Sequence, residues 1–391
     1  MDKMFSLSVI TLYLLHTITA ASSQVSAIQF NNFGYSGAYT PVVDLANIYD
    51  DTCSCAVASK PTTFSGTNTP LNEEVSVHFR GPLQLYNFAS YVSQDFTLGD
   101  NSGEFTRLSF YDSAEGTADN VTFLTRAGKN SSCLGFGLTY ADTDGISKAN
   151  SPTVLADDTL INSNQEYVIF SNLTCDKSGV NNDCGVYRED IPAYHGFYGT
   201  TKMFLFKFSM PNETKSAWDV ANYNMPAIWL LNAQIPRTAQ YSNDVNCSCW
   251  RSGCGEFDVF EVMNVTEYTH LYSTIHDYQG TDDIESGLAG NGYIDRDLNG
   301  TMVGGVVFDS TGKVIVWMSD DTTFDETVQA GDLNSWIKGA EKNAVTTTLP
   351  TASLAVATET GTGSSTTKKN SGVVVARSSL ITVLSSLLWF I

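Results

Sequence analysis

The chain has 391 residues, of which 42% are hydrophobic and 12% aromatic, so it is long enough to bury at least one sizeable core. It carries 42 Asp and Glu against 21 Lys and Arg, a formal net charge of −21. Such an acidic protein is a poor partner for nucleic acid or for an anionic lipid surface, because like charges repel. A neutral polysaccharide remains a suitable ligand.

The first residues have the pattern of a secretory signal peptide, which we expect at residues 1–21. Lys3 precedes an apolar run from Phe5 to Ile18, and the small residues Thr19 to Ser22 offer a cleavage site. An N-terminal membrane anchor is the alternative, but the run is shorter than the ~20 residues that a spanning helix needs. We therefore expect an extracellular protein.

Glycosylation motifs and an even number of cysteines agree with secretion. Asn-x-Ser/Thr sequons occur at Asn120, Asn130, Asn172, Asn212, Asn246, Asn264 and Asn299. Eight cysteines suit an oxidising compartment, and the one pairing that we predict is Cys175 with Cys184, because it closes a short loop. Metal binding by Cys247, Cys249 and Cys254 is the alternative to disulfides, but their spacing lacks the matching second pair of a thiolate zinc site. We predict no metal and no cofactor.

Short runs of β-branched and aromatic residues alternate with Gly, Asn, Asp and Ser turns, which predicts an all-β sandwich or jelly roll. Helical periodicity appears only weakly, around Asp332 to Trp336. A soft boundary near residue 100 separates an N-terminal β-rich region, 22–100, from a main domain, 101–340. The N-terminal region is either a separate small module or strands adjoining the main sandwich, and we favour the second arrangement.

The segment from Gly255 to Met263 has the composition of a buried strand, but it also carries three carboxylates. Glu256 and Asp258 share one face, because side chains alternate along a strand. Glu261 would face the opposite way in a regular strand. One extra residue, a β-bulge at Val259-Phe260, returns it to the first face. We therefore predict a bulged strand whose three acids line one groove.

Three carboxylates in one groove suit retaining glycoside hydrolysis. One must be ionised to attack the anomeric carbon, and a second must be protonated to release the leaving sugar. A third carboxylate between them repels both charges and can share a proton or a hydrogen bond with one neighbour. An acidic strand on a solvated edge is the alternative interpretation of the motif by itself.

The surroundings of this strand resemble glycoside hydrolase family 16. Pro226 to Leu231 reads Pro-Ala-Ile-Trp-Leu-Leu, Gly255 to Glu261 reads Gly-Glu-Phe-Asp-Val-Phe-Glu, and a strand carrying His276 follows. A more specific similarity, to the fungal GPI-anchored cell-wall proteins described as circularly permuted endo-1,3-β-glucanases, rests on Met225 to Met263, His78 to Leu83 and Ala193 to Phe197. The resemblance covers roughly Val75 to Trp336.

This resemblance implies a concanavalin-like β-jelly-roll sandwich of two antiparallel sheets, with a glucan cleft across the concave sheet. By motif match, Glu256 would be the nucleophile, Glu261 the acid/base and Asp258 their helper. The implied activity is cleavage of internal β-1,3-glucosidic bonds in cell-wall glucan. We expect the protein to be a monomer. Two alternatives stay open: a transglycosylase that passes the same intermediate to a sugar hydroxyl, and a non-catalytic glucan-binding wall protein.

Four side chains are candidate sugar contacts: Trp229, Trp250, His276 and His195. Pyranose faces are apolar with a polar rim, so aromatic rings suit them. An aromatic residue in a β-sandwich also lies in the core more often than not, and core packing is the main alternative for Trp229.

The C-terminal part first becomes a Ser/Thr-rich stalk, which we expect at residues 341–370. From about Ala344 to Thr367 it has too few large apolar side chains to offset the entropy of ordering.

The last residues, 371–391, read as a GPI-attachment propeptide. Small residues at Asn370 to Gly372, a spacer and an apolar end form the signal, with Asn370 as the expected attachment residue and Gly363-Ser364 as the alternative. A transmembrane helix over the same residues is disfavoured by Arg377. We expect a protein that is tethered by lipid at the plasma membrane, the cell wall, or both.

Overall fold

The computed structural model describes residues 24–215 and 220–351. The expected signal peptide, the GPI propeptide and Asn370 lie outside these residues, and so does the stalk beyond residue 351. Within the described part of the chain, no helix has both the length and the apolar character needed to cross a membrane.

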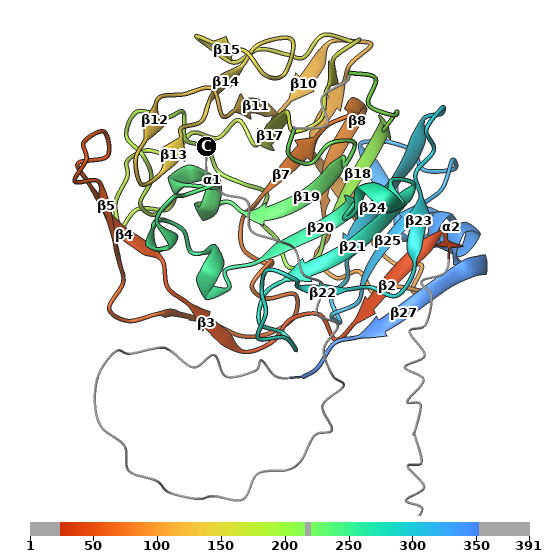
Figure 1. Cartoon of the computed structure of the whole chain (residues 1–391). Helices are drawn as coiled ribbons and strands as arrows, with labels where there is room; N and C mark the ends of the chain where they lie inside the picture. Colours follow the sequence, from red (N-terminus) through yellow and green to blue (C-terminus); the bar gives the residue numbers. More distant parts are fainter. Residues whose placement is uncertain (1–23, 216–219, 352–391) are drawn as a thin grey trace, which may run out of the picture. The chain divides into compact units, whose positions relative to one another are not determined.

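Two large β-sheets form the framework of the described residues (Figure 1). The first sheet contains, in spatial order, β1 (Gln24–Val25), β23 (Tyr293–Asp295), β21 (His270–His276), β20 (Glu256–Glu261), β19 (Ala227–Asn232), β7 (Val75–Arg80), β17 (Glu166–Phe170), β11 (Thr122–Thr125), β14 (Thr139–Ala141) and β15 (Lys148–Ala149), with β22 (Leu288–Ala289) also paired to β21.

The second sheet contains, in spatial order, β10 (Thr117–Asp119), β9 (Glu104–Asp112), β8 (Leu83–Val92), β18 (Lys202–Ser209), β24 (Met302–Phe308), β25 (Val314–Met318), β2 (Ala27–Asn31) and β27 (Ala344–Thr348), with β16 (Leu160–Ile161) on β8 and β26 (Thr327–Gln329) on β9. The all-β sandwich is therefore confirmed. The sheets are mixed and not purely antiparallel, because β1 pairs parallel to β23 and β2 pairs parallel to β27. Each parallel pair joins strands far apart in the chain, which leaves ample length for the crossover that parallel pairing requires.

Shorter elements surround the two sheets. The two-stranded pairs are β3 (Gly37–Tyr39) with β6 (Thr62–Phe64), β4 (Val42–Ala46) with β5 (Ser54–Val57), and β12 (Asn130–Ser131) with β13 (Gly135–Phe136). The described helices are α1 (Gln234–Thr238), α2 (Ala330–Ala340) and four 3₁₀ turns, η1 (Val245–Cys247), η2 (Trp250–Ser252), η3 (Val265–Glu267) and η4 (Glu341–Asn343). The weak helical pattern around residue 332 thus corresponds to α2.

The main core lies between the two sheets and is rich in phenylalanine. Phe260 on β20 packs against Phe208 on β18, with ring centroids 5.5 Å apart. Phe257, also on β20, meets Phe308 on β24 at 6.0 Å. All four rings are fully buried. Burial of such rings supplies the main hydrophobic stabilisation, at about 25 cal/mol per Å² of apolar surface.

Strands from the N-terminal region lie in the middle of both sheets. β7 pairs with β19 on one side and β17 on the other. β8 lies between β18 and β9 in the second sheet. Residues before position 100 therefore help to form the same two sheets as the later residues.

The chain stays folded further toward its C-terminus than composition suggested. Residues 344–348, which we expected in the stalk, form β27 and pair with β2. Leu349 follows and is buried in the main core. Strands pair through backbone hydrogen bonds, which Thr-rich segments form as well as others do. This strand therefore needs few large side chains to hold its place.

All eight cysteines are paired in the structure. The bonds are Cys53–Cys133, Cys55–Cys247, Cys175–Cys184 and Cys249–Cys254. The predicted pairing of Cys175 with Cys184 is confirmed. Their sulfur atoms are consumed in disulfides, so the metal-binding alternative for Cys247, Cys249 and Cys254 does not hold.

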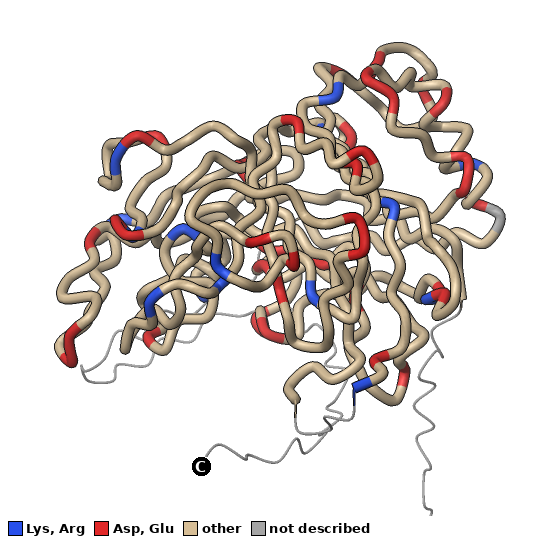
Figure 2. Tube along the Cα trace, turned by 90° about the horizontal axis from the view of Figure 1, so that it is seen from above, with Lys and Arg blue, Asp and Glu red and all other residues tan. Residues whose placement is uncertain are grey.

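Acidic residues outnumber basic ones along the chain, as Figure 2 shows.

Six of the seven sequon asparagines are exposed: Asn130, Asn172, Asn212, Asn246, Asn264 and Asn299. Asn120 is half-buried, and its side chain donates to the Leu108 carbonyl and accepts from the Asn172 amide. Glycosylation at these positions stays a prediction.

Candidate active site

The strand β20 contains the predicted bulge. Its pairing with β19 aligns Asp258 with Trp229 and Phe260 with Ile228, so Val259 has no partner across the ladder. The pairing with β21 shows the same shift between Asp258 and Glu261. Both Val259 and Phe260 are fully buried in the core between the sheets. The extra residue therefore turns Glu261 to the face that Glu256 and Asp258 occupy.

We call Glu256, Asp258 and Glu261 the carboxylate cluster. It lies on the face of the first sheet that points away from the main core. The neighbouring strand β19 follows the same alternation, since Ile228 and Leu230 face the core while the other side is covered by a separate small cluster.

Asp258 is held by a histidine on the next strand. Its Oδ2 lies 2.9 Å from Nε2 of His276. The other ring nitrogen, Nδ1, lies 2.7 Å from the carbonyl oxygen of Ile284. A ring with acceptors at both nitrogens is held most favourably as imidazolium, because both nitrogens then donate. His276 therefore supplies a positive charge beside the cluster.

Glu261 is held by an arginine from the N-terminal region. The guanidinium Nη2 of Arg80 lies 2.9 Å from Oε1 of Glu261. The Nε of Arg80 donates to the Met225 carbonyl at 2.8 Å. Arg80, Ala227 and Glu261 are aligned across β7, β19 and β20. Arg80 reaches across the small side chain of Ala227, so the ion pair follows directly from the strand register.

Glu256 accepts a hydrogen bond from the indole Nε1 of Trp250. Trp250 lies in η2, inside the loop that Cys249–Cys254 closes. A second disulfide, Cys55–Cys247, ties the preceding residues to β5. Two disulfides thus restrain the segment that places the indole on this carboxylate.

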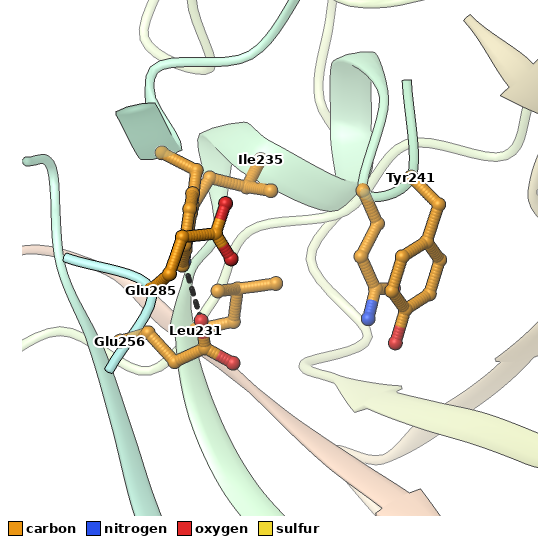
Figure 3. A pocket seen from close by; sticks show the side chains of 7 residues that line it. Leu231, Ile235, Tyr241, Glu256 and Glu285 are labelled. Atoms are coloured by element: carbon orange, nitrogen blue, oxygen red, sulfur yellow. Dashed lines mark hydrogen bonds between the residues drawn. The ribbon is translucent and has the colours of Figure 1, made fainter. Parts of the chain in front are cut away.

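A pocket of about 220 Å³ opens at Glu256. It is lined by Leu231, Ile235, Gln240, Tyr241, Trp250, Glu256 and Glu285. Figure 3 shows Glu256 and Glu285 on one side of it and Tyr241 on the other. The lining combines apolar, aromatic and carboxylate side chains, which is the mixture that a sugar ring requires.

Burial dominates the acid–base properties of the cluster. It raises the pKa of Glu256 to about 8, and the charge of Asp258 adds to the effect. Burial and Asp258 also raise the pKa of Glu261 to about 7, although Arg80 acts in the opposite direction. Burial alone would lower the pKa of His276, but Asp258 and Glu256 outweigh it and raise that pKa to about 10.

These charges balance when the cluster holds one proton. The three carboxylates face two cations, Arg80 and His276. One protonated carboxyl makes the group neutral, and a neutral group is the least costly to bury. The cluster therefore contains, near neutral pH, both a carboxylate that can act as a base or nucleophile and a carboxylic acid that can donate a proton.

Two of the four candidate sugar contacts, Trp250 and His276, lie at the cluster. Trp229 lies on the same face but is 3% exposed, and its ring stacks on His78 with centroids 5.0 Å apart. Trp229 thus packs beside the carboxylate cluster and exposes little surface to a sugar.

His195 lies in a different group, which we call the His195 cluster: Glu74, Asp183, His195 and Arg237. Nδ1 of His195 lies 2.6 Å from Glu74 and Nε2 lies 3.2 Å from Asp183. Arg237 also pairs with Glu74, at 2.9 Å. With both ring nitrogens occupied, His195 already has partners for the hydrogen bonds that a sugar would need.

Sequence reasoning did not single out Arg80, Tyr241 or Glu285. Arg80 carries a usable signal, because it ends the polar face that Ser76 and His78 form on the strand Val75–Arg80, and a charge there needs a partner once the strand is buried. Tyr241 and Glu285 lie in irregular segments. Their approach to Glu256 depends on loop paths that carry no periodic signal.

Comparison with known proteins adds independent information. Residues 103–336 match the family described as "Cell wall protein YJL171C/Tos1, C-terminal", and residues 26–93 match its N-terminal counterpart. A Candida albicans protein named "Probable circularly permuted 1,3-beta-glucanase PGA52" is 66% identical over 95% of both chains. The Saccharomyces cerevisiae protein of the same description, YJL171C, is 47% identical over 94% of this chain and 92% of its own length.

A third relative, Saccharomyces cerevisiae TOS1, also named a probable circularly permuted 1,3-beta-glucanase, is 31% identical over 82% of this chain and 92% of its own. No solved structure matches. Arg80 comes from the segment that matches the N-terminal family description, and the carboxylate cluster comes from the C-terminal one, so the site needs both segments. On these matches, the chain belongs to the YJL171C/Tos1 family of fungal cell wall proteins.

Proposed function

We propose that this protein is a cell-surface glycoside hydrolase that cleaves internal β-1,3-glucosidic bonds of wall glucan with retention of configuration. The observation that carries the proposal is the bulge in β20, which brings three carboxylates to one face beside a sugar-sized pocket. The names of the relatives support the substrate class. The expected signal peptide and lipid tether support a position at the plasma membrane or in the wall.

In the first step the carboxylate of Glu256 attacks the anomeric carbon while the bond to the leaving sugar oxygen breaks. Glu261 donates its proton to that oxygen. In the second step Glu261 takes a proton from water, and the water oxygen displaces Glu256 from the sugar. Asp258, hydrogen-bonded to His276, raises the pKa of both glutamates and so favours a proton on one of them.

The free site gives Glu256 a higher pKa than Glu261, the reverse of the order that these roles require. Substrate changes this balance. Positive charge develops at the anomeric carbon, which favours the ionised form of the carboxylate beneath it. The indole N–H of Trp250 also favours the ionised form of Glu256. The shared proton then belongs on Glu261, next to the leaving oxygen.

The decisive experiment compares wild type with Glu256→Gln on purified β-1,3-glucan. We expect the variant to lose at least about a thousandfold in release of reducing ends, because the covalent step is removed. Glu115→Gln, at an exposed turn, serves as the matched control and should behave as wild type. Equal release by wild type and Glu256→Gln, or release by neither, would refute the enzymatic proposal.

Product analysis on a defined oligosaccharide then decides the fate of the intermediate. Hydrolysis gives products shorter than the substrate. Products longer than the substrate would mean that a sugar hydroxyl replaces water, and the enzyme would then be a transglycosylase on the same site.

A further inference from the structure

A second pocket, of about 290 Å³, shares the end of β19 and helix α1 with the candidate active site. Leu231 and Ile235 line the first pocket, whereas Asn232, Gln234 and Arg237 line the second. The two pockets are therefore neighbours built on one short segment. We call the second one the distal pocket.

An exposed aromatic ring stands at the distal pocket. Tyr198 lines it and is 65% exposed, the highest value among the exposed large hydrophobic side chains of the described residues. Its backbone neighbours are fixed to the start of β7. Phe197 exchanges two backbone hydrogen bonds with Val75, and the Gly199 amide donates to the Asn72 carbonyl.

Lys202 restrains the same segment from inside the protein. Its fully buried Nζ donates to the carbonyl oxygens of Glu73 and Phe197, at 3.0 and 3.3 Å. The ring of Tyr198 is thus presented to solvent on a rigid support. The backbone that carries Tyr198 therefore needs no ordering when a ligand binds, which limits the entropy cost to the side chain.

The rest of the distal pocket consists of fixed hydrogen-bonding groups. Asn232 and Tyr39 both donate to the Glu73 carboxylate, at 2.9 and 3.0 Å. Gln234 donates to the Tyr39 hydroxyl at 2.8 Å. Arg237 is 3% exposed, and its Nε has no hydrogen-bond partner among the described residues. These mutual hydrogen bonds hold the polar side chains in fixed positions around the distal pocket.

The charges of the distal pocket exclude one ligand class. Glu73, Glu74 and Asp183 outnumber the guanidinium of Arg237, so the pocket repels an anion. A neutral polyol meets no such repulsion. An exposed ring flanked by planar polar side chains is the arrangement that binds a pyranose, since the ring takes the apolar face and the polar groups take the hydroxyls.

We propose that the distal pocket is an additional subsite for the β-1,3-glucan chain, with Tyr198 as its stacking platform. The identity of the ligand rests on the proposed function, because the glucan is the chain held in the neighbouring pocket. Chains long enough to span both pockets then bind more tightly than short ones.

Binding measured without turnover tests the subsite. The inactive Glu256→Gln protein is titrated calorimetrically with a β-1,3-linked trisaccharide and with longer oligosaccharides of the same linkage. Adding Tyr198→Ala should weaken binding of the longer chains by about five- to tenfold, with a smaller change for the trisaccharide. Gln234→Ala should show the same length dependence more weakly. Leu108 is an exposed residue on the second sheet, and Leu108→Ala is the control. It should change neither the binding of the trisaccharide nor that of the longer chains.

The outcomes separate this inference from the proposed function. If wild type lacks glucanase activity but Tyr198→Ala still weakens long-chain binding, the subsite stands and the enzymatic proposal falls. If wild type is active but Tyr198→Ala binds every chain as its parent does, the subsite is refuted. Preferential binding of another neutral oligosaccharide, such as a β-1,4-linked one, would also refute it. If the unfolding midpoint of the Tyr198→Ala protein equals that of its parent, the substitution has left the fold intact.

Discussion

The carboxylate cluster together with Arg80 and His276 has the same residue types as the His195 cluster, yet its acids are more deeply buried and its charges are arranged differently. In the His195 cluster, burial would raise the pKa of Glu74, but Arg237, His195 and the Gly196 amide lower it overall. In the carboxylate cluster, three acids share two cations, and the pKa of Glu256 rises to about 8.

The difference shows that burial of acids does not by itself make a reactive site. Glu74 has a dedicated cation and a dedicated amide, so its charge is fixed and its role is to hold the chain together. Glu256 and Glu261 compete for a proton, so their charge can change during a reaction. A histidine and an arginine accompany the acids in each case, so the difference lies in the number of acids and in how deeply they are buried.

The largest expected contrast is between Glu261→Gln and Glu74→Gln. Loss of a general acid should reduce kcat/KM on β-1,3-glucan by about a hundredfold or more. Loss of Glu74 should leave Arg237 without its counter-charge and destabilise the fold by about 2 kcal/mol, a value reduced for the partial exposure of Glu74. Activity assays and urea unfolding of both variants give the comparison. Equal activity losses in two folded variants would contradict it.

The next contrast concerns stability and pH. Glu256 has a pKa of about 8 when folded against 4.5 otherwise, so the folded protein binds this proton more tightly. Its contribution to stability is complete below pH 4.5 and is lost as pH rises toward 8. At about pH 9, Glu256→Gln should therefore be more stable than wild type by on the order of 3 kcal/mol. Its free energy of unfolding should also fall less than that of wild type between about pH 5 and pH 9.

The contribution of Glu74 to stability should depend on pH in the opposite direction, which the same experiment on Glu74→Gln measures. Its folded pKa is lowered, so its contribution is present above the unfolded pKa and is lost as pH falls through the folded one. Urea midpoints across the pH range measure both effects. A steeper alkaline loss of stability in Glu256→Gln than in wild type would overturn the description of the carboxylate cluster.

The smallest contrast is between two arginines. Arg80 lowers the pKa of Glu261, so Arg80→Gln should move the alkaline limb of the kcat profile, which reports the substrate-bound site, upward by about one pH unit. Arg237→Gln, in the His195 cluster, should leave that limb in place. Movement of the acidic limb in Arg80→Gln would instead exchange the assigned roles of Glu256 and Glu261.

Several features of the site were predictable from local sequence. The two-residue repeat of a strand requires a bulge if Glu256 and Glu261 are to share a face, and the bulge lies at the predicted residues. The short spacing of Cys175 and Cys184 likewise identifies their bond. Such inferences succeed because side-chain direction along one strand depends only on the strand itself.

The residues themselves thus determined an all-β sandwich and the three acids of the cluster. Only the tertiary structure decided which charges meet them. Arg80 reaches Glu261 across 181 positions of the chain, and His195 pairs with Glu74 across 121. The parallel strand at 344–348 depends in the same way on β2 at the opposite end of the described chain. Pairings of this kind follow from strand order in space, which local periodicity does not encode.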